Sequence, residues 1–450
     1  MVDWATSSAR TNTLEMNATT IDSRRLMITG ANGYIGRRLV CVARLRGFEV
    51  VAAVRNPRGF PPLDGVSVRQ FDLTRAQDVE EPWPEVDAVI HLAAIVAEDS
   101  KPADADEDRN VSGTRRLVEA ARKHGVGRFV FLSSQSAAPD SPTRYGRSKW
   151  EIEQMLTGPG ECSVRTGLVS GGPPRGVYGV LFRMAKRFPV LPFIRPGAPV
   201  YPIHVDDLCQ GLLSLVEEKS PPVALMRLAA SASMPFGEYV RTLARNRLGK
   251  RLRLLAVPPR LILALSRLTA AVPLLPTVSR ERVLGLIALR PMEIDSIPAP
   301  PRATPPRNVA QALAAEGERR RLLVEARVLM SYVLGSNVPP GVLRRYVRAV
   351  LAEDDRGPID FSCTVRTWPA LLRTIEPVGE AEQRLGRRLA IATRIAEMTP
   401  LAAPRFHNYR DRSRWIVWPA LVWLLTVEAA LLPLRWVSRR FAGRRGTGTD

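Results

Sequence analysis

Leu26–Gly36 reads LMITGANGYIG, a short apolar run that ends in a TGxxGxxG turn. Gly30 allows a sharp turn from strand to helix, Gly33 lets a pyrophosphate approach the backbone, and Gly36 lets the helix pack close to the sheet. The following helix would offer free N–H groups and the positive end of its dipole to phosphates. The stretch therefore predicts a dinucleotide-binding βα unit. The cofactor contacts expected here are Gly30, Asn32, Gly33, Tyr34, Ile35 and Gly36.

Short apolar runs alternate with amphipathic stretches from Arg24 to about Val169. The runs expected as buried strands are Leu26–Thr29, Glu49–Val54, Ala88–Leu92, Arg128–Leu132 and Ser163–Arg165. The stretches expected as helices between them are Tyr34–Arg46, Val111–His124 and Tyr145–Thr157. Such a series predicts an α/β fold with a Rossmann-type, doubly wound parallel sheet covered on both faces. Beyond Val169, frequent Pro and Gly predict the loops of a small substrate lobe.

The length of 450 residues and a hydrophobic content of 45% predict more than one core. Pro298–Pro306 holds five prolines in nine residues, which is typical of a linker. Helical patterns follow at Asn308–Gly335, Gly341–Ala352 and Glu380–Met398. The predicted parts are a flexible arm (1–23), a Rossmann domain with substrate lobe (24–297), a Pro-rich linker (298–307), a mostly α-helical domain (308–410), and an apolar helix with a basic tail (411–450).

The net charge of +21 comes almost entirely from arginine. Such a surplus suits nucleic acid or anionic lipid, but the cations are spread along the chain without interleaved aromatic residues, so we expect no nucleic-acid partner. The four cysteines lie far apart, without a CxxC pair or a nearby histidine, and predict neither a metal site nor a disulfide framework. The N-terminus has no apolar core before a small-residue cleavage site. We therefore expect a reducing, cytoplasmic compartment.

Trp415–Leu434 is a twenty-residue stretch in which Glu428 is the only charge. The length suffices to cross a bilayer, but the basic flanks and Glu428 favour an in-plane or re-entrant helix over a simple span. A true span and a buried or partner-binding helix remain alternatives. The prediction is association with a membrane surface or membrane protein through residues 415–436, on the cytoplasmic face. Leu261–Leu275 is a second apolar stretch, for which core and lipid-facing lobe are both open.

The end of the second predicted strand, Val54-Arg55-Asn56, lacks the acid that would bind a ribose 2′-hydroxyl. Arg55, together with Arg37, would suit a 2′-phosphate, so NADP is favoured and NAD remains possible. The alternative is a solvated surface arginine. His91 is expected to be structural, because small residues after the fourth strand already let a ring and ribose lie against the backbone. Further cofactor contacts are expected from Asp72, Leu73, Leu92, Ala93 and Ala94.

Tyr145-Gly146-Arg147-Ser148-Lys149 places a phenol and an ammonium one turn apart on one helix face. A neighbouring cation favours the phenolate, which lowers the pKa of Tyr145 so that it can exchange a proton with a substrate hydroxyl or carbonyl. Ser134, at the end of the fifth predicted strand, can hydrogen-bond the same oxygen. The predicted catalytic residues are Ser134, Tyr145 and Lys149, and the last two are also expected to contact the cofactor.

These motifs resemble the extended branch of the short-chain dehydrogenase/reductase superfamily, the NAD-dependent epimerase/dehydratase type. The matching segments, within about residues 24–290, are Thr29–Gly36, His91–Ala94, Asn110–Thr114, Ser133–Ser134, Tyr145–Lys149, Arg165–Val169 and Ile203–Asp207. The resemblance implies that Lys149 holds the nicotinamide ribose, that Tyr145 is the acid/base and that Ser134 orients the reacting oxygen. It also implies that Asn110 orders the supporting helix and that His204–Asp207 packs the substrate lobe.

By this resemblance we expect an NAD(P)-dependent oxidoreductase or epimerase that transfers hydride between nicotinamide and a carbinol or carbonyl carbon. Its substrate would be a nucleotide-sugar or a lipid-like molecule. Two departures support an alternative: the Ser134-to-Tyr145 connection is short, and Gln135–Pro139 replaces the usual Val-Tyr-Gly. With Arg55, these resemble atypical members such as the NADPH-holding accessory subunit of respiratory NADH dehydrogenase. They imply a non-catalytic NADP(H)-binding assembly or scaffold protein at a membrane complex. A redox sensor is a third possibility, and the oligomeric state is not predicted.

Overall fold

The computed structural model describes residues 24–80, 83–95, 103–194, 196–219, 222–258, 289–293, 296–335, 338–353, 357–373, 380–399 and 426. Contacts divide the chain into two units, Met1–Glu316 and Gly317–Asp450. The predicted arm 1–23 and the stretch Leu261–Leu275 lie outside the described residues, as does Trp415–Leu434 except for Thr426. No helix in the part that is described is both long and apolar enough to cross a bilayer.

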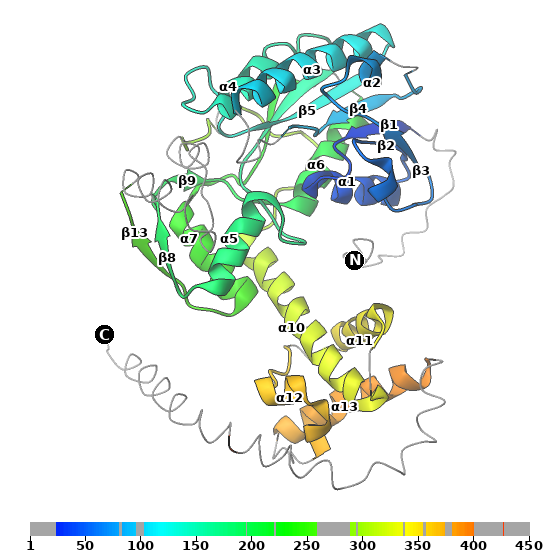
Figure 1. Cartoon of the computed structure of the whole chain (residues 1–450), viewed down its shortest axis with the longest axis vertical. Helices are drawn as coiled ribbons and strands as arrows, with labels where there is room; N and C mark the ends of the chain where they lie inside the picture. The colour runs from blue at the N-terminus through cyan, green and yellow to red at the C-terminus, as the bar shows by residue number, and fades with distance from the viewer. Residues whose placement is uncertain are drawn as a thin grey trace. The chain divides into compact units, whose positions relative to one another are not determined.

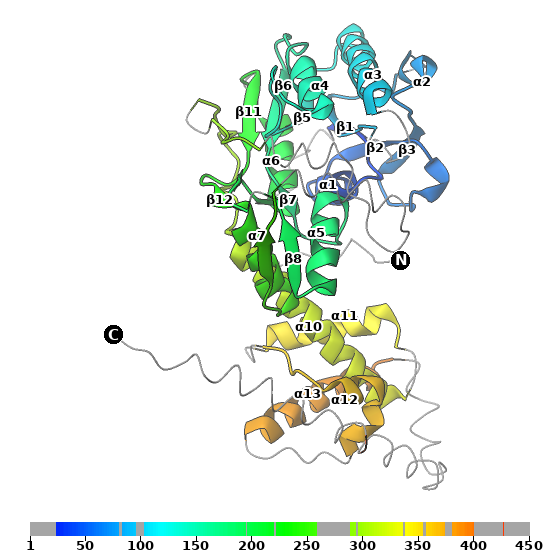
Figure 2. The same ribbon diagram turned by 60° about the vertical axis from the view of Figure 1, so that its left-hand side comes forward.

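A seven-stranded parallel sheet forms the centre of the first unit, in the order β11-β6-β5-β4-β1-β2-β3 (Figures 1 and 2). Its strands are β1 (Arg25–Thr29), β2 (Glu49–Val54), β3 (Val66–Gln70), β4 (Ala88–His91), β5 (Arg128–Ser134), β6 (Glu161–Thr166) and β11 (Leu225–Leu228). In the middle of the sheet, Met27 of β1 pairs with Val51 of β2 and with Val89 of β4. All five predicted strands are present, each with ends close to the predicted ones.

Helices cover both faces of this sheet (Figures 1 and 2). The first unit has α1 (Tyr34–Leu45), α2 (Ala76–Glu80), α3 (Ala103–Lys123), α4 (Arg144–Glu153) and α6 (Val205–Glu217), with the short helix η1 (Pro57–Gly59). Leu26 and Ile28 of β1 join the core formed with α1 and α6, whereas Met27 joins the core formed with α3 and α4. Burial on both faces explains why the strands are apolar throughout rather than alternating. The predicted Rossmann-type fold is confirmed.

The strand order reverses at β1, which lies between β2 and β4. In an open parallel sheet, ligands bind at the carboxyl ends of the strands beside such a reversal. This places the turn after Thr29 next to the residues that follow His91. A Cβ built on Gly30 would lie 2.9 Å from Ala93 Cα, which shows how closely the two strand ends approach.

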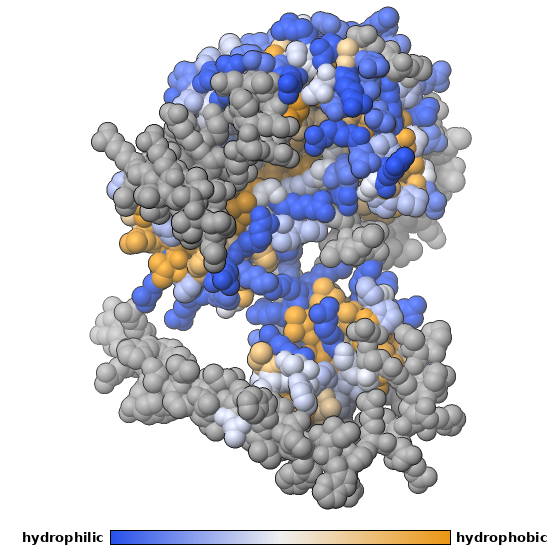
Figure 3. Space-filling view, viewed as in Figure 1, coloured by the Kyte–Doolittle hydropathy of each residue, from blue (hydrophilic) through white to orange (hydrophobic). Residues whose placement is uncertain are grey.

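A smaller lobe packs around its own core of aromatic and aliphatic side chains, in which the Phe193 and Phe236 rings meet edge to face at 4.9 Å. Its helices are α5 (Gly176–Arg187), α7 (Phe236–Thr242) and the π-helical turn η2 (Leu243–Arg247). Three two-stranded sheets join β7 (Val169–Ser170) to β10 (Ile203–His204), β9 (Pro199–Val200) to β12 (Met234–Pro235), and β8 (Val190–Phe193) to β13 (Arg253–Ala256). Hydrophobic residues gather on the surface over β8 and β13 (Figure 3).

The described part of the second unit is helical. It contains most of α10 (Val309–Leu334), α11 (Pro340–Ala352), α12 (Cys363–Thr367), η3 (Pro369–Arg373) and α13 (Glu380–Glu397). The buried carboxylate of Glu325 accepts hydrogen bonds from Tyr346 Oη at 2.7 Å and from the Ile359 backbone N–H at 2.6 Å, and it lies 3.5 Å from the buried guanidinium of Arg388. The predicted linker 298–307 lies within the first unit, and the division falls inside α10.

Candidate functional site

The glycine-rich turn between β1 and α1 is as tight as its sequence requires. Gly30 has φ of +68°, and the Gly33 N–H donates to Gly30 O at 2.8 Å. A Cβ on Gly36 would collide with Gly30 O and lie 2.8 Å from Ala31 Cα. Gly33 is the N-cap of α1 and supplies no side-chain oxygen to the first turn. The first N–H groups of the helix therefore face the turn, where a phosphate would bind them.

His91, at the end of β4, is buried and has two threonine partners. Its Nδ1 lies 2.7 Å from Thr29 Oγ1 and its Nε2 lies 3.0 Å from Thr114 Oγ1. Thr29 Oγ1 also accepts hydrogen bonds from the backbone N–H groups of Leu92 and Ala93, both at 3.2 Å. Burial first, and the charge of Lys149 second, lower the pKa of His91 to about 3. A neutral imidazole that accepts from Thr29 and donates to Thr114 satisfies every group, so His91 fixes the ends of β1 and β4 as expected.

Four other residues predicted to contact the cofactor have side chains that pack in or against the two cores of the sheet. Leu73 and Ala93 pack in the core under α3 and α4, while Ile35 and Leu92 pack against the core under α1 and α6. Their side chains are therefore used in core packing, and the cofactor contacts assigned to these residues stay predictions. Asn110 of α3 receives the Ile95 N–H at 2.7 Å on Oδ1 and donates to Ile95 O at 3.0 Å. These bonds hold the chain that follows Ala94, whereas the role expected for Asn110 was to order the supporting helix, which stays a prediction.

Arg55 and Asp72 follow β2 and β3 at the same edge of the sheet. Asp72 Oδ1 accepts from Thr74 N–H at 3.0 Å and from Thr74 Oγ1 at 2.8 Å. Burial acts to raise the pKa of Asp72, but the Thr74 bonds and the charge of Arg55 outweigh it and lower that pKa. Arg37 is used differently, because its Nε donates to Asn32 Oδ1 at 2.7 Å and to Asn32 O at 3.1 Å. Of the two arginines, Arg55 is the one placed at the end of β2.

Tyr145 and Lys149 lie one turn apart at the start of α4. The helix begins after Thr143, whose Oγ1 accepts the Gly146 N–H at 3.1 Å. The Tyr145 side chain is 42% exposed, whereas Lys149 is 8% exposed. Lys149 Nζ donates to Leu132 O at 2.9 Å and lies 5.8 Å from the centre of the Tyr145 ring. A fixed ammonium thus lies one helical turn from a partly exposed tyrosine.

Ser134 ends β5 and starts a tight turn. Its Oγ lies 3.0 Å from Ser136 Oγ and accepts the Ser136 N–H at 3.2 Å. The next residue, Gln135, donates from Nε2 to Pro199 O at 3.1 Å and to Arg290 O at 2.7 Å. Gln135, in the segment that differs from the family pattern, is therefore bonded to Pro199 of the smaller lobe and to Arg290. The catalytic roles assigned to Ser134, Tyr145 and Lys149 remain predictions.

Glu153 was not predicted from the sequence, yet it holds α4 to the sheet one turn beyond Lys149. Its Oε1 accepts from Ser133 Oγ at 2.6 Å and from Arg165 Nε at 2.9 Å, and its Oε2 accepts from Arg165 Nη2 at 2.7 Å. The side chains of Glu153 and Arg165 are 4% and 18% exposed. The signal available in the sequence is the four-residue spacing of Tyr145, Lys149 and Glu153, which puts all three on one helix face.

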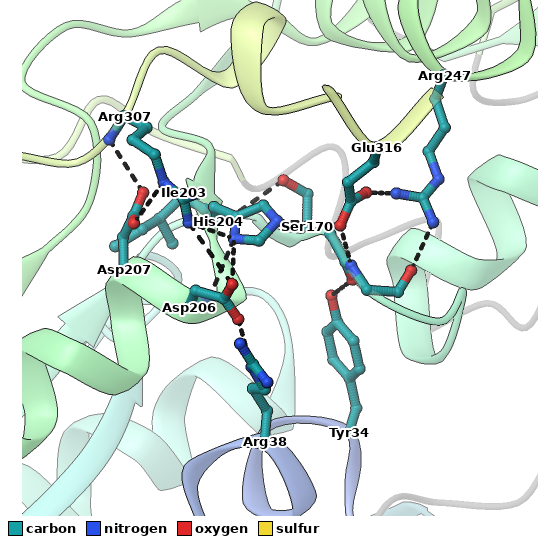
Figure 4. Close-up of polar contacts among 12 residues, drawn as sticks. Tyr34, Arg38, Ser170, Ile203, His204, Asp206, Asp207, Arg247, Arg307 and Glu316 are labelled. Atoms are coloured by element: carbon teal, nitrogen blue, oxygen red, sulfur yellow. Dashed lines mark hydrogen bonds and ion pairs between the residues drawn. The ribbon is translucent and has the colours of Figure 1, made fainter. Parts of the chain in front are cut away.

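A second polar network joins α1, the start of α6 and the residues that follow the Pro-rich stretch (Figure 4). Arg38 Nε bonds Asp206 Oδ1 at 2.5 Å, and Arg307 Nε bonds Asp207 Oδ1 at 2.8 Å. His204 Nδ1 accepts from the Asp206 N–H at 3.2 Å and from Arg307 Nη2 at 2.9 Å. Burial lowers the pKa of His204 to about 4, so its neutral ring can donate from Nε2.

Glu316 accepts this hydrogen bond from His204 and connects the network to the smaller lobe. Its Oε1 lies 3.1 Å from His204 Nε2 and accepts the Gly172 N–H at 2.5 Å, while its Oε2 pairs with Arg247 (Figure 4). Tyr34, predicted as a cofactor contact, donates its hydroxyl to Gly171 O at 2.6 Å. The Tyr34 hydroxyl thus bonds the lobe, which leaves its backbone N–H at the start of α1 for a phosphate. Sequence reasoning missed Glu316, since no motif surrounds it.

Residues 26–223 match the sequence model of the NAD dependent epimerase/dehydratase family. The sterol demethylase protein B of Methylococcus capsulatus is 33% identical over 148 residues, which cover 32% of this chain and 44% of that protein. The ceramide reductase of Caulobacter vibrioides is 29% identical over 206 residues, which cover 45% of this chain and 63% of that protein. The chain thus spans less than two thirds of the length of either relative. The structure of UDP-glucose 4-epimerase from Thermus thermophilus in complex with NAD superposes with a TM-score of 0.45 at 24% identity, covering 59% of this chain and 97% of that one.

Proposed function

We propose that this protein is an NAD(P)-dependent oxidoreductase or epimerase, because residues 26–223 match the sequence model of the NAD dependent epimerase/dehydratase family. It would transfer hydride between nicotinamide and a carbinol or carbonyl carbon. The observation that carries the proposal is the pairing of an exposed phenol, Tyr145, with an ammonium, Lys149, that is held in place by Leu132 O. A protein that only bound the nucleotide would not need this pair.

The turn around Gly30 and Gly36 fits a dinucleotide, since a Cβ at either position would meet backbone. The residues that would hold the cofactor are the α1 N-terminus for the pyrophosphate, Arg55 for a 2′-phosphate, the chain after His91 for the ribose and ring, and Lys149 for the nicotinamide ribose. When bound, the nicotinamide supplies or accepts the hydride.

The remaining chemistry is proton transfer by this chain. In the oxidation direction, Tyr145 Oη accepts the proton of the substrate hydroxyl while the carbinol carbon gives up its hydride. The charge of Lys149 favours the phenolate that does this, and Ser134 Oγ bonds the substrate oxygen. The neutral His91 is enclosed by Thr29 and Thr114 and takes no part in the transfer. In the reduction direction, the proton returns from Tyr145 to the new alkoxide.

We favour NADP over NAD and a lipid-like alcohol or ketone over a nucleotide-sugar. Arg55 at the end of β2 supports the first preference, because a guanidinium suits a 2′-phosphate where the usual acid is missing. The names of the two relatives, sterol demethylase protein B and ceramide reductase, support the second. A lipid-like substrate also suits membrane association on the cytoplasmic face through residues 415–436, which the sequence predicts.

The test is steady-state turnover of NADPH with a panel of sterol, ceramide-type and nucleotide-sugar ketones. Tyr145→Phe should lower kcat at least about 100-fold, because general acid–base groups contribute on that order or more. Its NADPH affinity should fall far less than kcat, because the glycine-rich turn, Arg55 and Lys149 remain. The matched control is Tyr332→Phe in the second unit, which should retain full activity. Equal turnover by Tyr145→Phe and the native protein would refute the proposal.

A non-catalytic NADP(H)-binding assembly protein is the second candidate. The bonding of Ser134 by Ser136 supports it, since a catalytic serine has to offer its hydroxyl to substrate. This alternative predicts tight NADPH binding, no turnover with any ketone of the panel, and stoichiometric co-purification with a membrane complex.

A further inference from the structure

One face of the small sheet formed by β8 and β13 points away from the lobe core. Leu191 and Phe193 of β8 are buried in that core, so the alternate residues of the strand face outward. The parallel register sets Val190 beside Arg253 and Pro192 beside Leu255, on the outward side. Phe188 directly precedes β8. We call the surface of Phe188, Val190, Pro192 and Leu255 the β8–β13 face.

This face is apolar and accessible. Phe188 is 41% exposed, Val190 49% and Leu255 62%, and Pro192 is also exposed. Single exposed apolar side chains are ordinary on soluble proteins, whereas several that share one face mark an interaction surface. Figure 3 shows hydrophobic residues gathered at this place over β8 and β13, next to strongly hydrophilic ones.

The chain around the two strands is basic, and the acid nearest to β13 in the described sequence is Glu238 of α7. Residues 176–200 and 239–258 contain ten Lys or Arg and no Asp or Glu. The cations of these segments that are exposed beside the strands are Lys186, Arg187, Lys250, Arg251 and Arg253. Lys250 Nζ donates to Lys186 O at 2.6 Å. This bond uses one N–H of the ammonium and leaves its positive charge in place. In the part of the chain that the structure describes, none of the five forms a salt bridge with a carboxylate.

We propose that the β8–β13 face docks on the surface of an anionic phospholipid bilayer. Its apolar centre would enter the boundary between headgroups and acyl chains, while the five cations contact lipid phosphates. This division of an apolar centre and a basic rim is the one that interfacial membrane segments use. Nucleic acid suits the face less, because binding of single strands relies on aromatic stacking and the centre is mainly aliphatic.

Docking through the β8–β13 face is a function separate from the proposed activity. The face includes no residue of the glycine-rich turn and neither Tyr145 nor Lys149, so docking and turnover can fail separately. It also adds a second membrane contact to the one that the sequence predicts at residues 415–436. With both, the lobe expected to bind substrate would lie at the bilayer itself.

The experiment uses the full chain with vesicles of phosphatidylcholine, with or without about 30% phosphatidylglycerol. Sedimentation measures partitioning, and hydrogen exchange locates the contact. Each Lys or Arg beside an anionic surface contributes roughly fivefold, so Lys250→Gln/Arg251→Gln/Arg253→Gln should lower partitioning at least about tenfold. Val190→Thr/Leu255→Gln should weaken it too. The matched control removes three cations from α11 (Arg344→Gln/Arg345→Gln/Arg348→Gln) and should bind as the native chain does.

We expect phosphatidylglycerol vesicles to protect residues 186–193 and 250–256 from exchange. Protection at 415–434 alone, with both β8–β13 variants binding normally, would overturn the proposal. Equal binding to vesicles without phosphatidylglycerol would overturn it as well, as would a β8–β13 defect that appears with DNA and not with vesicles. NADPH turnover with a water-soluble ketone should be normal in all three variants, which keeps this test separate from that of the proposed activity.

Discussion

Glu153→Gln should destabilise the first unit strongly, although it leaves the volume of the side chain almost unchanged. The carboxylate accepts two bonds from Arg165 and one from Ser133, and it joins α4 to β5 and β6. Its replacement by an amide removes the bonded counter-charge of Arg165 where that side chain is only 18% exposed, and leaves only the weaker, longer-range charge of Glu293. The hydrogen bonds to Glu153 are the main cause that raises the pKa of Arg165. The arginine stays charged in the variant even without them, because the ordinary pKa of a guanidinium lies far above neutral pH.

The size of the loss follows from the burial of the pair. Removing one partner of a buried pair costs about 3–5 kcal/mol, because the other charge remains buried. Partial access of water to Arg165 reduces this to roughly 2–4 kcal/mol. Glu161 offers a matched comparison, since it also receives two bonds from one arginine, Arg122, whose side chain is 44% exposed. Glu161→Gln should therefore cost no more than about 1 kcal/mol for the pair.

Urea denaturation, followed by circular dichroism, measures these losses. A double-mutant cycle of Glu153→Gln with Arg165→Met should give a coupling energy of about 1–3 kcal/mol, since the second change removes the unpaired charge that the first creates. If Glu153→Gln costs less than about 1 kcal/mol, or the two changes add without coupling, the pair does not hold α4 in the way inferred here. In the variant, the pH profile of turnover should shift, because Tyr145 and Lys149 stand on the same helix.

Three further predictions concern the nucleotide site. Gly36→Ala should weaken NADPH binding at least about tenfold by calorimetry, because its Cβ would meet Gly30 O and force the turn to move, whereas Gly59→Ala, where a Cβ has open space, should bind normally. Arg55→Ala should weaken NADPH about 10- to 100-fold, the value of a charge-assisted hydrogen bond, and leave NADH unchanged; equal losses for both cofactors would contradict the NADP assignment. The folded-state pKa of His91, about 3, lies below its ordinary 6.5, so the unfolded chain takes up the proton first and stability falls as the pH drops below 6.5. Between pH 6.5 and 5 this loss is about 2 kcal/mol, and urea denaturation should show it reduced in His91→Gln.

The sheet could be predicted because its strands are buried on both faces. Continuous apolar runs such as Glu49–Val54 need no knowledge of the neighbouring strands to be recognised, and this run is the observed β2. The glycine-rich turn could be predicted for a similar reason, because the backbone contacts that exclude a Cβ at Gly36 come from Gly30 and Ala31, only a few residues away. Lys149 was found by its spacing from Tyr145. Each of these features is local in the sequence.

The features that were missed depend on pairings between distant residues. Glu153 reaches Arg165 across twelve positions, and Tyr34 reaches Gly171 across 137. The four-residue spacing places Glu153 on the helix face of Tyr145 and Lys149, but only the fold shows that it meets Arg165 there. Tyr34 was predicted to contact the cofactor because it lies in the glycine-rich turn, but where its hydroxyl bonds depends on how the lobe folds back. The role of Glu153 and that of the Tyr34 hydroxyl therefore depend on their partners in the folded chain rather than on residue type.

A shift in composition is a poor guide to where the first unit ends, because bonds between distant residues decide where it ends. The prolines between 298 and 306 suggest a linker, yet the chain after them remains bonded to the unit: Arg307 holds Asp207, and Glu316 bonds both His204 and Gly172. Glu316 also supplies the counter-charge of Arg247, whose side chain is 11% exposed. A buried arginine needs such a partner, so the N-terminal unit is electrostatically complete only when it includes the first turns of α10. The family match ends at residue 223, well before this carboxylate, so the family's sequence model does not include it.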